Sequence, residues 1–274
     1  MSTVPVPAAF GDPDAGGSVA GLVDYLDGAT GVARVLAGKR ARATMLTPVP
    51  GLRVLDVGCG TGDSLRLLAE RVAPGGSAVG VDVSSALLDV GRHRAALEGW
   101  SAEWVHADAA VLPFDDGEFD GCLVERVLQH VDSPQAVVAE TLRVTRPGGM
   151  VVIAEPDWRS LILDAGPVAV RDAVAAAAGR GIRHREVGRS LRRLLVDAGF
   201  VDVDVDAEVH VSGDVAVVRD LALVDQAVAD LEQSGELDGR VLQEWTDALE
   251  ADARGGRFTG ALTLFVARGQ VPTP

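Results

Sequence analysis

Short apolar segments alternate with longer amphipathic ones through the middle of this chain, and this alternation restricts the fold more than any other feature. The first apolar segment, residues 52–57, is followed at 65–72 by leucines and a valine at broadly helical spacing. The same strand-then-helix pattern recurs over residues 77–97 and 119–145. Strands this apolar need cover on both faces, so the pattern predicts a parallel sheet between two layers of helices.

The remaining expected strands are 103–107, 149–155, 200–208 and 258–267. Together with right-handed crossovers they predict an α/β, doubly wound, mostly parallel sheet of seven strands with a Rossmann-like order. Helices at 18–47 are expected before the first strand, and 156–187 and 213–254 are expected to be helical insertions. Loops after parallel strands emerge at the carboxyl edge of the sheet, so these insertions are predicted to form a lid over a ligand crevice. The alternative is helices that only cover the sheet edge.

The chain has 274 residues and a formal charge of −15, from 25 basic and 40 acidic side chains. At about 150 residues per domain, this length fits one large domain or two small ones, and we expect one domain over 18–274 after a disordered arm at 1–17. The negative charge opposes binding to nucleic acids or anionic membranes.

Lys39 is the single lysine, and its neighbours do not fit a phosphate loop or a Schiff-base site. Cys59 and Cys122 lie in apolar segments typical of reduced thiols, and we find no apolar run long enough for a signal peptide or a transmembrane helix. A cytoplasmic location is the expectation.

A glycine-rich turn follows the first expected strand, at Gly58, Gly60 and Gly62. Glycine allows a tight turn and a close approach of ligand to backbone. A dinucleotide fingerprint would have its third glycine at position 63, where this chain has Asp63. A carboxylate at a helix start disfavours a pyrophosphate there, but tolerates a ligand that carries sulfonium and ammonium groups and no phosphate.

The segment DVGCGTG at 56–62 resembles motif I of the class I S-adenosylmethionine-dependent methyltransferases, of the small-molecule and natural-product type. The resemblance covers roughly residues 50–155 and implies S-adenosylmethionine as the cofactor. It implies that Asp82 binds the ribose, for which helix capping is the alternative, and that Asp108 contacts the adenine, for which a loop aspartate bonded to its own backbone is the alternative. The cofactor residues it implies are Tyr25, Arg40, Asp56, Gly58, Gly60, Gly62, Asp82, Val83, Asp108, Ala109, Glu125 and Arg126.

Three more of these residues leave alternatives open. Asp56 either contacts the ligand or only holds the glycine loop. Arg126 pairs either with the methionine carboxylate of the cofactor or with Glu125 or Glu155. Tyr25 either closes over the cofactor or is an ordinary half-buried helix residue.

Methyl transfer to a hydroxyl also needs a group that takes the proton. His130 follows the strand at 119–125, and Glu155 ends the next strand, so both are predicted to reach the carboxyl edge. Some O-methyltransferases of the resembling family use a histidine and an acidic residue at similar places, which makes His130 the predicted base and Glu155 its partner. The alternatives are a loop histidine bonded to backbone, and an ion pair of Glu155 with Arg126 or Arg159. Cysteine and histidine spacing predicts no metal site.

An arginine-rich segment at 180–193 contrasts with the acidic chain. Arg183 or Arg185 could anchor an anionic acceptor, although a solvated amphipathic helix is the simpler interpretation. Trp158 either lines the acceptor site or belongs to the core.

The sequence therefore predicts a methyltransferase that acts on a small molecule at oxygen, with His130 as the base. The alternatives are C-methylation of a quinone or polyketide ring, and a cyclase or scaffold that binds S-adenosylmethionine without transferring methyl. No nucleic-acid or membrane partner is expected, and the oligomeric state stays open.

Overall fold

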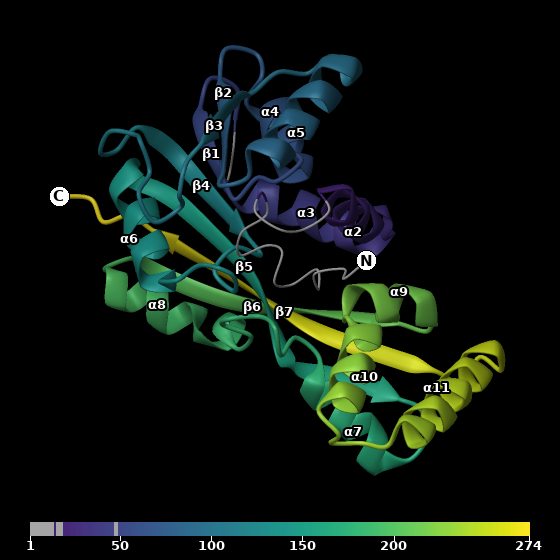
Figure 1. The fold of residues 1–274 in the computed structure, drawn as a ribbon. Helices are drawn as coiled ribbons and strands as arrows, with labels where there is room; N and C mark the ends of the chain where they lie inside the picture. The colour runs from purple at the N-terminus through teal and green to yellow at the C-terminus, as the bar shows by residue number, and fades with distance from the viewer. Residues whose placement is uncertain (1–13, 15–18, 47–48) are drawn as a thin grey trace.

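The structure is a computed structural model that describes residue 14, residues 19–46 and residues 49–274. One seven-stranded sheet runs through it in the order β3-β2-β1-β4-β5-β7-β6 (Figure 1). β7 is antiparallel to β5 and β6, whereas the other neighbours pair in parallel, so the predicted mostly parallel α/β sheet is confirmed. The strands are β1 (Arg53–Val57), β2 (Ser77–Asp82), β3 (Glu103–His106), β4 (Phe119–Glu125), β5 (Thr145–Asp164), β6 (Val201–Ser212) and β7 (Thr259–Gln270).

Helices cover both faces of the parallel part of the sheet. Val54 packs on the face that α3, α4 and α5 cover, whereas Leu55 packs on the face that α6 and α8 cover. These neighbours face opposite ways because side chains alternate along a strand. The helices of this part are α2 (Val19–Gly31), α3 (Ala33–Met45), α4 (Asp63–Val72), α5 (Ser85–Glu98), α6 (Pro134–Val144), the 3₁₀ turn η1 (Val187–Ser190) and α8 (Leu191–Ala198).

Polar side chains begin two of these helices. Ser84 accepts a hydrogen bond from the Leu87 N–H, and Ser133 accepts one from the Ala136 N–H, which satisfies N–H groups that have no partner within the helix. Most of the predicted arm, residues 1–13 and 15–17, lies outside the described residues. Asp14 is described, and its carboxylate accepts hydrogen bonds from Ser84 and Ser85 at the start of α5.

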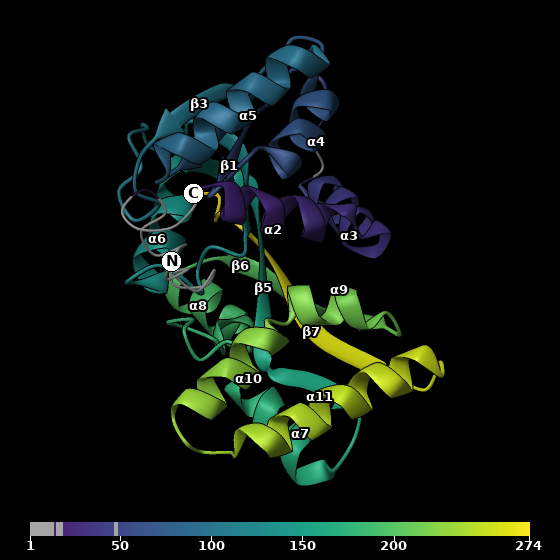
Figure 2. The same ribbon diagram turned by 45° about the vertical axis from the view of Figure 1, so that its right-hand side comes forward.

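A second group of helices, which we call the helical lobe, packs around its own apolar core. Figure 2 shows that long extensions of β5 and β7 connect this lobe to the parallel sheet. On the other side, α2 contacts both α9 of the lobe and α5. The lobe consists of α7 (Val168–Ala177), α9 (Val215–Leu221), α10 (Val224–Gln233) and α11 (Gly239–Arg254).

The prediction of a helical insertion over 156–187 is wrong at its start, because β5 continues to Asp164. Leu161 and Leu163 are buried there while Ile162 and Asp164 are exposed, and this alternation with a period of two is typical of a strand. The extension of β5 pairs with β7, so the backbone N–H and carbonyl groups of this segment are hydrogen-bonded between strands and not within a helix. Within the described residues, no helix is long and apolar enough to cross a membrane.

Candidate active site

A cavity of about 430 Å³ lies at the carboxyl ends of the parallel strands and brings most of the predicted site residues together. It forms there because the glycine turn after β1 leaves room between the ends of β2 and β4. Lys39 of α3 and Leu26 of α2 also line it. The predicted residues on its wall are Tyr25, Asp56, Gly58, Gly60, Asp82, Val83, Asp108, Ala109, Glu125, Arg126 and His130.

The three glycines of the turn have different structural roles. All have positive φ angles, and the Gly58 N–H donates to the Val81 carbonyl at 2.7 Å, which holds the turn against β2. A Cβ at Gly58 would collide with Val127, whereas a Cβ at Gly60 would face the cavity and make only an ordinary contact with Leu26, at 3.6 Å. Gly60 is therefore the position at which a ligand could approach the backbone.

The position of Gly62 does not agree with the prediction that this residue contacts the cofactor. It does not line the cavity, and it lies at the N-cap of α4 with φ of 93°. A Cβ here would collide with the Trp104 ring. The residue is glycine because the turn needs a left-handed conformation and the indole packs against it.

Asp82 and Asp108 lie on the cavity wall, and the carboxylate of each accepts hydrogen bonds from backbone N–H groups. Asp82 accepts hydrogen bonds from the Gly60 and Ser84 N–H groups at 2.8 and 2.9 Å. Burial raises the pKa of Asp82, and these N–H groups oppose that shift. Asp108 accepts a hydrogen bond from the Ala110 N–H at 2.8 Å. Each oxygen of a carboxylate has two lone pairs, so both residues can accept from a ligand as well.

Asp56 contributes a buried oxygen atom to this wall. Its side chain is 2% exposed, and its Oδ2 has no hydrogen-bond partner among the described residues. Burial raises the pKa of Asp56 to about 8, and the charge of Lys39 opposes that shift. A buried polar atom without a partner is costly, so this oxygen fits a ligand that brings a donor such as an ammonium group. The donor set and the open space at Gly60 thus fit a nucleoside joined to an amino acid.

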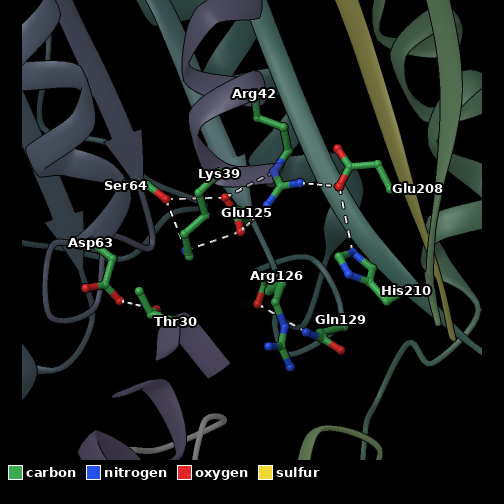
Figure 3. Close-up of polar contacts among 10 residues, drawn as sticks. All are labelled: Thr30, Lys39, Arg42, Asp63, Ser64, Glu125, Arg126, Gln129, Glu208 and His210. Atoms are coloured by element: carbon green, nitrogen blue, oxygen red, sulfur yellow. Dashed lines mark hydrogen bonds and ion pairs between the residues drawn. The ribbon is translucent and has the colours of Figure 1, made fainter. Parts of the chain in front are cut away.

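Charged side chains from α3 meet Glu125 at the end of β4 (Figure 3). Arg42, which is 1% exposed, donates to Glu125 at 2.9 Å and to Glu208 of β6 at 2.6 Å. Lys39 lies 3.2 Å from Glu125 on the cavity side and donates to Ser64. Burial opposes ionisation of Glu125, but Lys39 and Arg42 lower its pKa to about 2. The two cations therefore keep this carboxylate charged.

Arg40 is exposed on α3 and does not line the cavity, which corrects its predicted cofactor role. Successive helical residues are about 100° apart, so Lys39 and Arg42 share a face that Arg40 does not. The sequence analysis missed Arg42 and did not assign Lys39 to the cofactor site. The available signal was the group of basic side chains on this helix, Arg34, Lys39, Arg40 and Arg42, in an otherwise acidic chain.

Arg126 and Tyr25 close the cavity together. The Arg126 guanidinium donates to the Tyr25 hydroxyl at 2.6 Å and lies over its ring, 5.4 Å from the centroid. Arg126 has a φ of 60°, an uncommon conformation for a residue with a side chain, and such strain is typical of sites that need a fixed geometry. The tyrosine thus packs over the cavity, and within the described residues neither Glu125 nor Glu155 accepts a hydrogen bond from the Arg126 guanidinium, whereas its pairing with the methionine carboxylate stays a prediction.

The structure does not bring His130 and Glu155 together as a pair. Glu155 is fully buried and does not line the cavity, and its Oε1 accepts hydrogen bonds from the Val127 and Leu128 N–H groups at 2.7 and 2.6 Å. Its carboxylate turns toward the loop after β4 because that loop has N–H groups to satisfy. This corrects the predicted catalytic role of Glu155.

His130 lines the cavity, but burial and the charge of Arg126 lower its pKa to about 3. A general base works best with a pKa near the operating pH. The lowered pKa therefore argues against His130 as the base.

The arginine-rich segment is mostly engaged by neighbouring groups. Arg180 pairs with Glu236, Arg183 with Asp132, and Arg185 donates to the Ala176 carbonyl. Arg183 alone of these three lines the cavity. Trp158 is 1% exposed and donates to Gln129, which places it in the core.

A second cavity, of about 170 Å³, lies between β5, β6, α3 and α9 and adjoins the first. The two share Ala29, Val35, Glu125 and Arg126 as wall residues. The second wall is mostly aliphatic, and its remaining polar side chains are Arg34, Arg42, His210 and Ser212. The sequence analysis placed His210 only near a sheet edge, because nothing local in the sequence shows that β6 passes beside α3.

Comparisons with known proteins agree with this geometry. Residues 55–153 match a family described as a methyltransferase domain. An uncharacterised 37.1 kDa protein in transposon Tn4556 of Streptomyces fradiae is 36% identical over 256 residues, which are 90% of this chain and 71% of that protein. The YcgJ protein of Bacillus subtilis has a similar fold, with a TM-score of 0.62 at 16% identity over 87% of this chain and all of that one.

A demethylmenaquinone methyltransferase of Clavibacter sepedonicus is 44% identical over 115 residues. The match covers 42% of this chain and spans less than half of that relative, 45% of its length. The glycine turn, Asp82 at the end of β2 and Asp108 just after β3 all lie in residues 55–153, which match the methyltransferase domain. The chain belongs to the class I S-adenosylmethionine-dependent methyltransferases.

Proposed function

We propose that the first cavity holds S-adenosylmethionine and that the second holds a small, largely apolar acceptor that is methylated at a hydroxyl oxygen. The observation that carries this proposal is the junction of the two cavities at Glu125 and Arg126. When bound, S-adenosylmethionine supplies a methyl group on a positively charged sulfur, which keeps the electron pair of the broken carbon–sulfur bond. Because that methyl is already activated, the protein contributes mainly alignment of the two molecules.

The hydrogen-bonding and charged groups on the wall of the first cavity indicate which residues would bind each part of the cofactor. Asp82 would accept from the ribose hydroxyls and Asp108 from the adenine amine, each with lone pairs left over from its backbone contact. Asp56 would offer its buried oxygen to the ammonium group of the methionine part, whose positive charge would favour the ionised carboxylate, and Lys39 would face the methionine carboxylate. Val83 and Ala109 would pack against the nucleoside between them.

The residues that line the second cavity indicate which class of methyl acceptor it would hold. An aliphatic cavity with a few polar groups suits an aromatic ring with a hydroxyl substituent. Three arginines face this space, Arg34, Arg42 and Arg126, and they would stabilise the oxygen as it loses its proton. C-methylation of a quinone ring is the second candidate, and the quinone methyltransferase relatives favour it.

Product analysis tests the proposal. The enzyme is incubated with S-adenosylmethionine carrying a labelled methyl group and with 1,4-naphthohydroquinone, and the product is identified by mass spectrometry. We expect a methyl ether and one S-adenosylhomocysteine for each acceptor methylated. A methyl group on a ring carbon would favour the second candidate, and an acceptor transformed while the cofactor stays unconsumed would indicate a cyclase or scaffold.

Two glycine substitutions separate cofactor binding from folding. In Gly60→Ala the added methyl group projects into the cavity at a φ of 53°, so we expect weaker binding of S-adenosylhomocysteine and a backbone cost of about 1–2 kcal/mol in the free energy of unfolding. In Gly62→Ala the methyl group meets Trp104 at a strained backbone position, so we expect the free energy of unfolding to fall by about 1–3 kcal/mol.

Calorimetry and urea denaturation measure the two effects. Gly99→Ala is the matched control, because Gly99 also has a positive φ, of 76°, and nothing lies within 4 Å of its added Cβ. If Gly60→Ala and Gly62→Ala lost affinity and stability in equal proportion, the separate roles assigned to these glycines would be wrong.

A further inference from the structure

Among the described residues, one histidine, His210, lines the second cavity. It lies on β6, and its side chain is 22% exposed. The other wall residues near it are mostly aliphatic side chains of β6, β7 and α9. An imidazole in such a wall is available to a polar atom of an otherwise apolar acceptor.

A chain of charged contacts ties His210 to the cofactor cavity (Figure 3). The His210 Nε2 lies 3.7 Å from the Glu208 Oε2, and the same oxygen accepts from Arg42 at 2.6 Å. Arg42 in turn holds Glu125, which lines both cavities. The carboxylate beside His210 is therefore held in place by a buried arginine and cannot swing freely.

We propose that His210 takes the proton from the acceptor hydroxyl during methyl transfer, with Glu208 as its positioning residue. This inference rests on the proposed function. The O–H bond breaks, its electron pair stays on the oxygen that forms the new bond to the methyl carbon, and the proton goes to the imidazole. Because Nε2 faces Glu208, Nδ1 is the nitrogen left to accept this proton.

The charged groups around His210 suit a neutral imidazole that can be protonated. The pKa of His210 lies below its ordinary value, because burial and the charges of Arg42, Arg34 and Arg126 lower it more than the charge of Glu208 raises it. The ring is thus neutral at neutral pH and ready to accept a proton. Glu208 would stabilise the imidazolium that forms. The shift of His130 is the large one, because burial and the charge of Arg126 lower its pKa to about 3.

The variant His210→Asn tests this role in turnover of 1,4-naphthohydroquinone. We expect kcat to fall by about 10²–10⁴-fold, with KM for the acceptor and affinity for S-adenosylhomocysteine nearly unchanged. The exposed His93 of α5 provides the matched control, and His93→Gln should keep full activity. Equal kcat in wild type and His210→Asn would overturn the inference alone, whereas no methylated product from wild type would contradict the proposed function itself.

A binding measurement supplies a readout that does not depend on turnover. 4-Nitrophenol changes its absorbance on ionisation, and it is titrated with pH in the presence of the S-adenosylhomocysteine complex of each protein. We expect wild type to hold the bound phenol as its anion at lower pH than His210→Asn does, because only wild type can keep the released proton beside it. The same titration curve for both proteins, or no binding to wild type, would overturn the assignment.

Discussion

Replacing Arg42 with methionine will lower the free energy of unfolding by roughly 3–5 kcal/mol. The guanidinium is buried and serves two carboxylates, Glu125 and Glu208. Methionine has a similar reach but no charge. Among the described residues, Lys39 would then remain as the only cation in contact with Glu125, and Glu208 would lose its buried partner. An uncompensated charge in a low-dielectric site costs more than the intact pair gains. Urea denaturation of the full chain at neutral pH measures the loss.

Arg40→Met is the control on the same helix, and it should change stability by less than about 0.5 kcal/mol because Arg40 is exposed. The pH dependence gives a second check. Glu125 has a pKa of about 2 when folded, against an ordinary value of 4.5, so its contribution to stability is present above about pH 4.5 and is lost as pH falls toward 2. The difference between wild type and Arg42→Met should shrink over the same range. A constant difference would show that Arg42 acts through packing and not through charge.

The parts of the fold and site that sequence could predict depend on local signals. The strands at 77–82 and 119–125 coincide with β2 and β4, because an apolar run between turn residues specifies a buried strand. The glycine turn and Asp82 lie together because the carboxyl ends of neighbouring parallel strands meet at one edge. These features need only short stretches of chain.

The parts that sequence could not predict depend on helix phase and on distant pairing. Arg40 and Arg42 are two residues apart, which turns them about 200° from one another, and a helix with no clear apolar face does not show which of them points inward. Arg42 and Glu208 are separated by 166 residues, and only the tertiary fold brings β6 beside α3. His210 lies on β6 as well, so its position beside the cavity also depends on the tertiary fold and could not be predicted from local sequence.

Glu155 was predicted to orient the base, but its contacts indicate that it holds the loop after β4. Replacing Glu155 with alanine removes the acceptor of two N–H groups, from Val127 and Leu128. Leaving a buried N–H without a partner costs about 1–3 kcal/mol for each group, so this variant should be strongly destabilised. Glutamine keeps a carbonyl oxygen for both N–H groups, and Glu155→Gln should fold with its turnover largely intact. Thermal unfolding and initial rates measure the two properties.

The pH dependence of Glu155→Gln distinguishes a structural carboxyl group from a catalytic one. Burial raises the pKa of Glu155 to about 8, although the backbone N–H groups oppose the shift. The folded protein therefore binds more protons than the unfolded chain between about pH 4.5 and pH 8, and wild-type stability falls across this range on account of Glu155. Glutamine does not titrate, so Glu155→Gln should gain stability relative to wild type as pH rises to 8. Asp56 also has a pKa of about 8, but it is present in both proteins and its effect cancels. If glutamine instead abolished turnover at unchanged stability, an ionised Glu155 would be needed for the chemistry and its structural role would be refuted.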